Sequence, residues 1–213
     1  MGTYSKGILG PFSGKVGTVV GASWRGKDVM RSLPKKTDRK PTDTQLLQRE
    51  KFTTVSEFLT PIGPVITLYY GTGSGELTRR NQAMSYHMKE AVTYVAPDFE
   101  ILFNKVQISK GDLLGVQNPT ASSPAAREIK FDWENNSGQG TAKDNDKLVV
   151  VLYSPAEGLY YYNLEAAERT AKTATISLPT YFGGLVVQAW ITFAAADDKN
   201  YATSVYMNAI TIL

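Results

Sequence analysis

The first 33 residues alternate between glycines and short runs of β-branched or aromatic side chains. Glycines recur every three to four residues from Gly7 to Gly21, but each interior glycine costs a helix about 1 kcal/mol relative to alanine, which argues against a helix here. Residues 16–24 favour a strand, and Gly26-Lys27 is typical of a two-residue type II′ turn with glycine at its first position. We therefore predict a β-hairpin, with residues 28–33 as its return strand.

A helical region is expected after the charged linker that follows the hairpin. Thr42 and Gln45 have the spacing of a capping box, in which each side chain bonds to the other residue's backbone N–H. Apolar side chains then recur at helical spacing up to Pro61 and again beyond it. This pattern predicts a helix that starts at Thr42 and ends or kinks at the proline.

A further helix is expected after a glycine-rich break at residues 71–75. Apolar side chains over residues 84–95 fall on one helical face, and Pro97 is expected to close this helix. Residues 1–97 are thus expected to form an α+β module built from a β-hairpin and about three helices.

From Phe99 onward the apolar pattern changes to short runs separated by turn clusters, such as residues 135–138. Seven short strands at roughly ten-residue intervals argue for an all-β sandwich over residues 98–213. The boundary between the two modules is expected near residues 97–104, and residues 118–124 are expected to be a connection. The expected strands cover residues 99–109, 128–133, 148–154, 159–163, 173–178, 185–194 and 205–213.

Charge is distributed unevenly along the chain. The net charge of +3 combines +6 over residues 1–50, +1 over residues 51–97 and −4 over residues 98–213. This distribution suggests an electrostatic surface in the first part or a solvated module that docks on its own acidic domain. The absence of cysteine excludes disulfides, thiolate nucleophiles and cysteine zinc sites. No signal-peptide pattern is visible, and no apolar run approaches the roughly 18 residues of a membrane span. A cytoplasmic or virion- or assembly-associated protein is expected.

Candidate catalytic, cofactor and metal sites are weak throughout the sequence. Residues 21–28 match a phosphate loop at seven positions, but Asp28 replaces the Ser or Thr that holds Mg²⁺ and would repel phosphate. His87 is the only histidine and lies in an expected helix, which favours a packing or surface role. The acidic pairs in residues 144–146 and 197–198 are expected to serve turn geometry. We therefore expect no catalytic residue, no cofactor and no metal ion, and a protein that is not an enzyme.

Basic side chains on the predicted hairpin and linker form the strongest candidate surface. Strand alternation places the bases of residues 25–31 on one face, beside Trp24. Clustered bases can neutralise phosphates and an aromatic ring can stack on a base, although charges on an exposed strand can also serve only to prevent edge pairing. The helical side chains Phe52, Val55 and Phe58 are expected to hold the opposite face. The candidate partner-binding residues are Trp24, Arg25, Lys27, Arg31, Lys35, Lys36, Arg39 and Lys40.

Short motifs occur in residues 7–26, 29–36, 44–49, 81–86, 106–111 and 118–119. Together they resemble DUF6266, a family of uncharacterised Bacteroidota proteins. The resemblance implies no activity and implies a bacterial or phage-derived source. Residues 104–213 also resemble a fibronectin type III or immunoglobulin-like module, with Trp133 in its second strand, and this likeness implies the fold alone.

These observations favour a non-enzymatic structural or interaction protein, for example a self-assembling component of a phage-like or cell-associated assembly. Its expected partner is a protein, either a second copy or another assembly component, because a glycine-rich arm can add strands to a neighbour by β-augmentation. The alternative is a nucleic-acid-binding protein that uses the basic hairpin.

Overall fold

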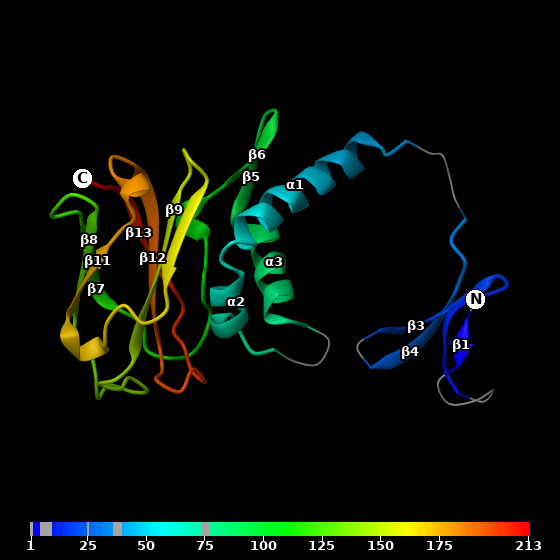
Figure 1. Ribbon diagram of the computed structural model, residues 1–213, viewed down its shortest axis with the longest axis horizontal. Helices are drawn as coiled ribbons and strands as arrows, with labels where there is room; N and C mark the ends of the chain where they lie inside the picture. Colours follow the sequence, from blue (N-terminus) through cyan, green and yellow to red (C-terminus); the bar gives the residue numbers. More distant parts are fainter. Residues whose placement is uncertain (1, 5–9, 25, 36–39, 74–76) are drawn as a thin grey trace. The chain divides into compact units, whose positions relative to one another are not determined.

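The chain divides into two compact units, Met1–Gln45 (the N-terminal unit) and Leu46–Leu213 (the C-terminal unit) (Figure 1). The computed structural model describes residues 2–4, 10–24, 26–35, 40–73 and 77–213. This division differs from the predicted boundary at residues 97/98, because the helices share a hydrophobic cluster with one sheet of the sandwich. Of the helices in the described ranges, none is both long and apolar enough to cross a bilayer.

The N-terminal unit is an antiparallel sheet with the strand order β1-β2-β3-β4. Its strands are β1 Thr3–Tyr4, β2 Phe12–Val16, β3 Val19–Trp24 and β4 Lys27–Ser32. The predicted hairpin corresponds to β3 and β4, but its turn begins one residue earlier, because Trp24 pairs with Lys27. Gly26 therefore takes the second turn position, where its φ of +77° is one that glycine adopts without strain.

Three helices follow, α1 Asp43–Leu59, α2 Gly63–Tyr69 and α3 Arg79–Glu90. The predicted capping box is confirmed: the Thr42 N–H donates to Gln45 Oε1 (3.2 Å), and the Gln45 N–H donates to Thr42 Oγ1 (3.4 Å). The predicted break at Pro61 is also confirmed, since α1 ends at Leu59 and α2 begins at Gly63. The third helix is shorter than predicted and ends at Glu90.

A small hairpin, β5 Val92–Val95 and β6 Asp98–Ile101, replaces the predicted end of the third helix and the start of the first sandwich strand. The two strands pair only with each other in the described sheets. Val92, Thr93 and Val95 are β-branched, and such residues lose side-chain freedom in a helix and fit a pleated surface better. Strand formation here therefore overrides the apolar spacing that suggested a helix.

The sandwich has two antiparallel sheets, with strand orders β10-β9-β12-β13 and β11-β8-β7. Six of its strands match predicted ones, and the seventh, β7, lies in the segment expected to be a connection. The strands are β7 Gln117–Ser122, β8 Glu128–Glu134, β9 Lys147–Ser154, β10 Leu159–Asn163, β11 Thr173–Ser177, β12 Val186–Ala194 and β13 Val205–Thr211. Single 3₁₀ turns occur at Phe103–Lys105, Arg169–Ala171 and Thr180–Phe182.

Strand β7 was missed because it contains Pro119, and proline cannot donate to a ladder. The structure accommodates the proline at an edge: β7 is the last strand of its sheet, and the register against β8 shifts between Gln117 and Thr120. Asn118, next to the proline, has a φ of +45°. Edge position and bulge are the two settings in which a strand tolerates proline.

The four-stranded sheet is covered on both faces, which gives the C-terminal unit three layers (Figure 1). One face packs against the three-stranded sheet in a cluster that includes Phe131, Leu152 and Ile191. The other face packs against the helices in a cluster that includes Leu59, Val151 and Trp190. Burial on both faces explains why β9 and β12 read as nearly continuous hydrophobic runs rather than alternating ones.

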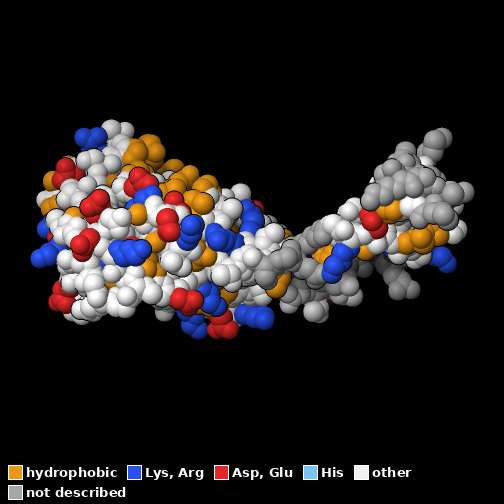
Figure 2. Space-filling view, turned by 90° about the horizontal axis from the view of Figure 1, so that it is seen from below, with side chains coloured by type: hydrophobic (Ala, Val, Ile, Leu, Met, Phe, Trp, Pro, Cys, Tyr) orange, Lys and Arg blue, Asp and Glu red, His pale blue; other side chains and the backbone are white. Residues whose placement is uncertain are grey.

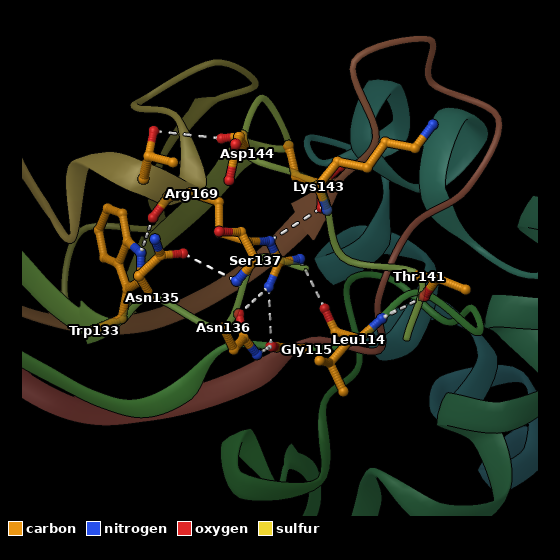
Figure 3. A network of polar contacts seen from close by, with 12 residues as sticks. Leu114, Gly115, Trp133, Asn135, Asn136, Ser137, Thr141, Lys143, Asp144 and Arg169 are labelled. Atoms are coloured by element: carbon orange, nitrogen blue, oxygen red, sulfur yellow. Dashed lines mark hydrogen bonds and ion pairs between the residues drawn. The ribbon is translucent and has the colours of Figure 1, made fainter. Parts of the chain in front are cut away.

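A buried ion pair fastens the loops at one end of the sandwich (Figure 3). The side chains of Arg169 and Asp146 are both fully buried, with Nε 3.0 Å from Oδ2. The guanidinium also donates to the carbonyl oxygen of Leu114 (2.8 Å) and to the side chain of Asn136, and it lies 3.9 Å from the centroid of the Phe193 ring. Asp146 was expected only to shape a turn, and the structure shows that it also neutralises this buried cation.

Candidate interaction surfaces

Strand pairing places three basic side chains of the N-terminal sheet on one face. Lys27 and Arg31 alternate along β4, and Lys15 on β2 is opposite Val20, which is itself opposite Arg31. Trp24 is opposite Lys27 and therefore belongs to the same face, because directly paired residues share a face. We call Lys15, Lys27 and Arg31 with Trp24 the basic face. The sequence predicted this grouping for Trp24, Lys27 and Arg31, and the structure adds Lys15.

The remaining candidate residues do not join this face in the described chain. Lys35 and Lys40 are exposed and lie outside the strands. Arg25, Lys36 and Arg39 lie outside the described residues. Among the described candidates, Trp24, Lys27 and Arg31 therefore share one strand face, and Lys35 and Lys40 follow it in the chain.

The N-terminal sheet has no hydrophobic core among its described residues. Every residue of β4 is exposed, and the only buried position in β2 to β4 is Gly21. Large apolar side chains lie at the surface, with Trp24 52% and Met30 69% exposed. Figure 2 shows hydrophobic side chains at the surface of this unit, next to Lys and Arg side chains. Met30 is opposite Gly21 and lies on the face opposite the basic one, so both faces of the sheet carry exposed apolar area.

The structure assigns another role to two of the helical side chains that the sequence placed against the hairpin. Val55 and Phe58 are buried in the cluster that α1 shares with the sandwich, so their side chains are already covered within the C-terminal unit. Phe52 is 51% exposed. The physical reason is that the outer face of the four-stranded sheet is itself apolar and takes up the buried side of α1.

The outer strand of the N-terminal sheet also has a polar edge. β4 is the last strand in the described order, and the Leu33 N–H donates to the Thr18 carbonyl oxygen (2.7 Å) in continuation of the β3–β4 register. Hydrogen-bonding directions alternate along an antiparallel strand. The odd-numbered residues of β4 therefore point their backbone groups toward β3, and Asp28, Met30 and Ser32 point theirs toward the open edge.

A groove of about 530 Å³ on the C-terminal unit is the second candidate surface. We call it the aromatic groove. Two carboxylates, Glu57 on α1 and Glu100 on β6, line it and are exposed, and neither forms an ion pair among the described residues. The groove is lined by Thr54, Glu57, Phe58, Pro61, Phe99, Glu100, Ile101, Phe103, Tyr153, Gly158 and Tyr160.

Aromatic rings from four elements meet beneath this groove. Tyr153 on β9 stacks on Tyr160 on β10 with centroids 4.4 Å apart, and the Phe58 ring meets Tyr153 edge-on at 5.5 Å. Trp190 Nε1 donates to the Phe103 carbonyl oxygen (3.2 Å). Burial, with a smaller contribution from Tyr153, raises the pKa of Tyr160 above its ordinary value. The ring hydroxyl therefore stays neutral, and the negative charge of the groove comes from its two carboxylates.

The groove could not be predicted from the sequence, because its lining residues lie between Thr54 and Tyr160 in segments that are far apart in the chain. A weak signal existed: Tyr153 and Tyr160 fall on the face of their strands that does not point into the sandwich interior. Without knowing that helices cover this face, the two tyrosines look like ordinary sheet residues.

The weak catalytic candidates have packing roles in the structure. His87 is fully buried, with Nδ1 2.8 Å from the Ala83 carbonyl oxygen and Nε2 accepting the Gln107 N–H (3.4 Å). Asp198 accepts a hydrogen bond from the Tyr69 hydroxyl (2.9 Å). Strand β4 follows the turn in the segment that resembles a phosphate loop, where a helix would be needed. Across the described ranges, no three metal-ligating side chains come together.

Comparison with known proteins gives one match over most of the chain. The family described as "Family of unknown function (DUF6266)" matches residues 11–208. No curated protein matches. Among solved structures, the fibronectin type III domain of the human collagen alpha-1(XX) chain is 12% identical, with a TM-score of 0.35 over 47% of this chain and 86% of that one.

Proposed function

We propose that this chain, which belongs to the family of unknown function DUF6266, is an assembly protein without catalytic activity. In this role the N-terminal sheet contacts other protein chains, and the three-layered C-terminal unit is the folded body that carries the sheet. A component of a phage-like or cell-associated assembly of bacterial origin fits this role, in the cytoplasm or in a particle.

The observation that carries the proposal is a sheet without a core. A sheet needs at least one face packed against another layer to be stable, yet Trp24 and Met30 are exposed on opposite faces and no described hydrophobic side chain of this unit is buried. A contact with another chain would bury this apolar area, which contributes about 25 cal/mol for each Å² removed from water. The exposed apolar area therefore favours a protein partner.

The open edge of β4 supports the same role. Its backbone groups at Asp28, Met30 and Ser32 can pair with a strand of a neighbouring chain, which is how β-augmentation supplies affinity. Lys27 and Arg31 on this strand would oppose pairing with another basic strand. The charges therefore favour a partner with acidic groups.

A nucleic-acid partner is the second candidate. It is favoured by the grouping of Lys15, Lys27 and Arg31 with Trp24 on one face, since bases neutralise phosphates and an aromatic ring stacks on a base. The opposite face, with its exposed Met30, has no role in this reading. We therefore rank it below the protein partner.

Sedimentation velocity of the full-length chain tests the proposal, in about 50 mM and about 500 mM NaCl, with and without a single-stranded oligonucleotide. The protein-assembly reading predicts a mass above the 23.4 kDa of one chain without nucleic acid. The nucleic-acid reading predicts that a larger species appears only with the oligonucleotide and is lost at high salt. A monomer that binds neither itself nor the oligonucleotide contradicts both readings.

A further inference from the structure

The aromatic groove combines two features that together select a cationic occupant. Glu57 and Glu100 bring two exposed carboxylates to one groove, and Phe58, Tyr153 and Tyr160 also line it. Aromatic faces and carboxylates both attract Lys and Arg side chains. The volume of about 530 Å³ lies in the range of pockets that enclose a ligand group. A basic side chain with an apolar neighbour is the chemistry that fits.

The chain itself carries the complementary surface. Residues 1–45 hold nine Lys and Arg against three acidic residues, a net charge of +6, whereas residues 46–213 hold fourteen against seventeen, a net charge of −3. The basic face joins Lys15, Lys27 and Arg31 to the exposed ring of Trp24. Its composition therefore mirrors that of the groove: cations and an aromatic anchor on one side, carboxylates and aromatic walls on the other.

We propose that the aromatic groove is a docking site for basic side chains, and that its occupant is the N-terminal sheet of a second copy of this chain. The inference rests on the proposed assembly function and names its partner. The basic face of one copy would lie on the groove of the next, with Arg31 and Lys15 near Glu57 and Glu100 and with Trp24 against the rings. The contact is heterologous, so it generates rings or open chains unless two copies exchange their sheets reciprocally.

Two full-length variants separate the two halves of this contact. The sheet variant carries Lys15→Ser, Lys27→Ser and Arg31→Ser, and the groove variant carries Glu57→Gln and Glu100→Gln. All five positions are exposed, so both variants should fold, which circular dichroism checks. The control variant, Glu90→Gln with Glu134→Gln, removes the same charge at exposed positions outside the groove.

Sedimentation velocity is then measured for each variant alone and for an equimolar mixture of the sheet and groove variants. We expect wild type and the control variant to assemble, and each of the two variants alone to sediment as a 23.4 kDa monomer. The mixture should form dimers, because the intact sheet of the groove variant still meets the intact groove of the sheet variant. High salt should dissociate these dimers, because it screens partly exposed charge pairs.

Three outcomes overturn the inference. A groove variant that assembles like wild type, beside a sheet variant that does not, leaves the proposed function standing and removes the groove as the docking site. A mixture that stays monomeric shows that the two surfaces do not meet. A monomeric wild type excludes a second copy as the occupant and contradicts the proposed assembly function as well.

Discussion

Replacement of Arg169 by methionine should cost the C-terminal unit about 3–5 kcal/mol of unfolding free energy, the range for a buried ion pair that loses one partner. The guanidinium and the Asp146 carboxylate are both fully buried, 3.0 Å apart. The substitution also removes the hydrogen bonds to the Leu114 carbonyl oxygen and the Asn136 side chain. Trp133 Nε1 donates to the backbone oxygen of residue 169 (2.8 Å), a contact that the substitution leaves in place.

Equilibrium urea unfolding followed by tryptophan fluorescence measures the loss, with Lys130→Met as the matched control. Lys130 pairs with Asp132 at 2.9 Å on β8, but the two side chains are 38% and 40% exposed, and such surface pairs contribute about 0–1 kcal/mol. The double variant R169M/D146L should recover part of the loss, because it removes the uncompensated charge. Equal losses for Arg169→Met and Lys130→Met would refute the reasoning that burial gives this pair its weight.

Three further predictions concern single positions. Thr42→Ala should cost about 1 kcal/mol by removing the cap of α1, measured in the same urea experiment. Burial lowers the pKa of His87 despite its hydrogen bond to a backbone carbonyl. Below about pH 6.5 the unfolded chain therefore binds a proton at His87 that the folded chain does not bind. The free energy of unfolding should fall on acidification by up to about 1.4 kcal/mol per pH unit, and His87→Gln should abolish this pH dependence. Gly21→Ala should disrupt the N-terminal sheet, because a Cβ there would lie 2.1 Å from the Phe12 carbonyl oxygen. Hydrogen exchange should then show loss of amide protection in β2 and β3, while the urea unfolding curve of the C-terminal unit stays unchanged.

Local chemistry made much of the fold predictable from the sequence. The Thr42–Gln45 box depends only on neighbouring atoms, and the strands from Glu128 onward have turn residues at both ends. Two failures came from tertiary context: β7 contains a proline that only an edge position accommodates, and the β-branched residues of β5 form a hairpin where helical spacing predicted a helix.

The two candidate surfaces also differ in whether the sequence could predict them. The basic face follows from strand alternation alone, which is why Trp24, Lys27 and Arg31 could be grouped before the structure was known. The aromatic groove could not, because it requires that α1 and β6 lie beside the sheet face that carries Tyr153 and Tyr160. The prediction that Val55 and Phe58 would hold the hairpin was wrong for the same reason: their periodicity shows that they are buried but not what they are buried against.

The most direct test of the central claim, that other chains complete the N-terminal sheet, is amide hydrogen exchange of β4 as a function of protein concentration. The Met30 and Ser32 amides point toward the open edge of the sheet, whereas the amides of β9 lie in the covered centre of the sandwich. We expect protection of the Met30 and Ser32 amides to rise with concentration over a hundredfold range while protection in β9 stays constant. Protection of β4 that does not change with concentration would contradict the claim.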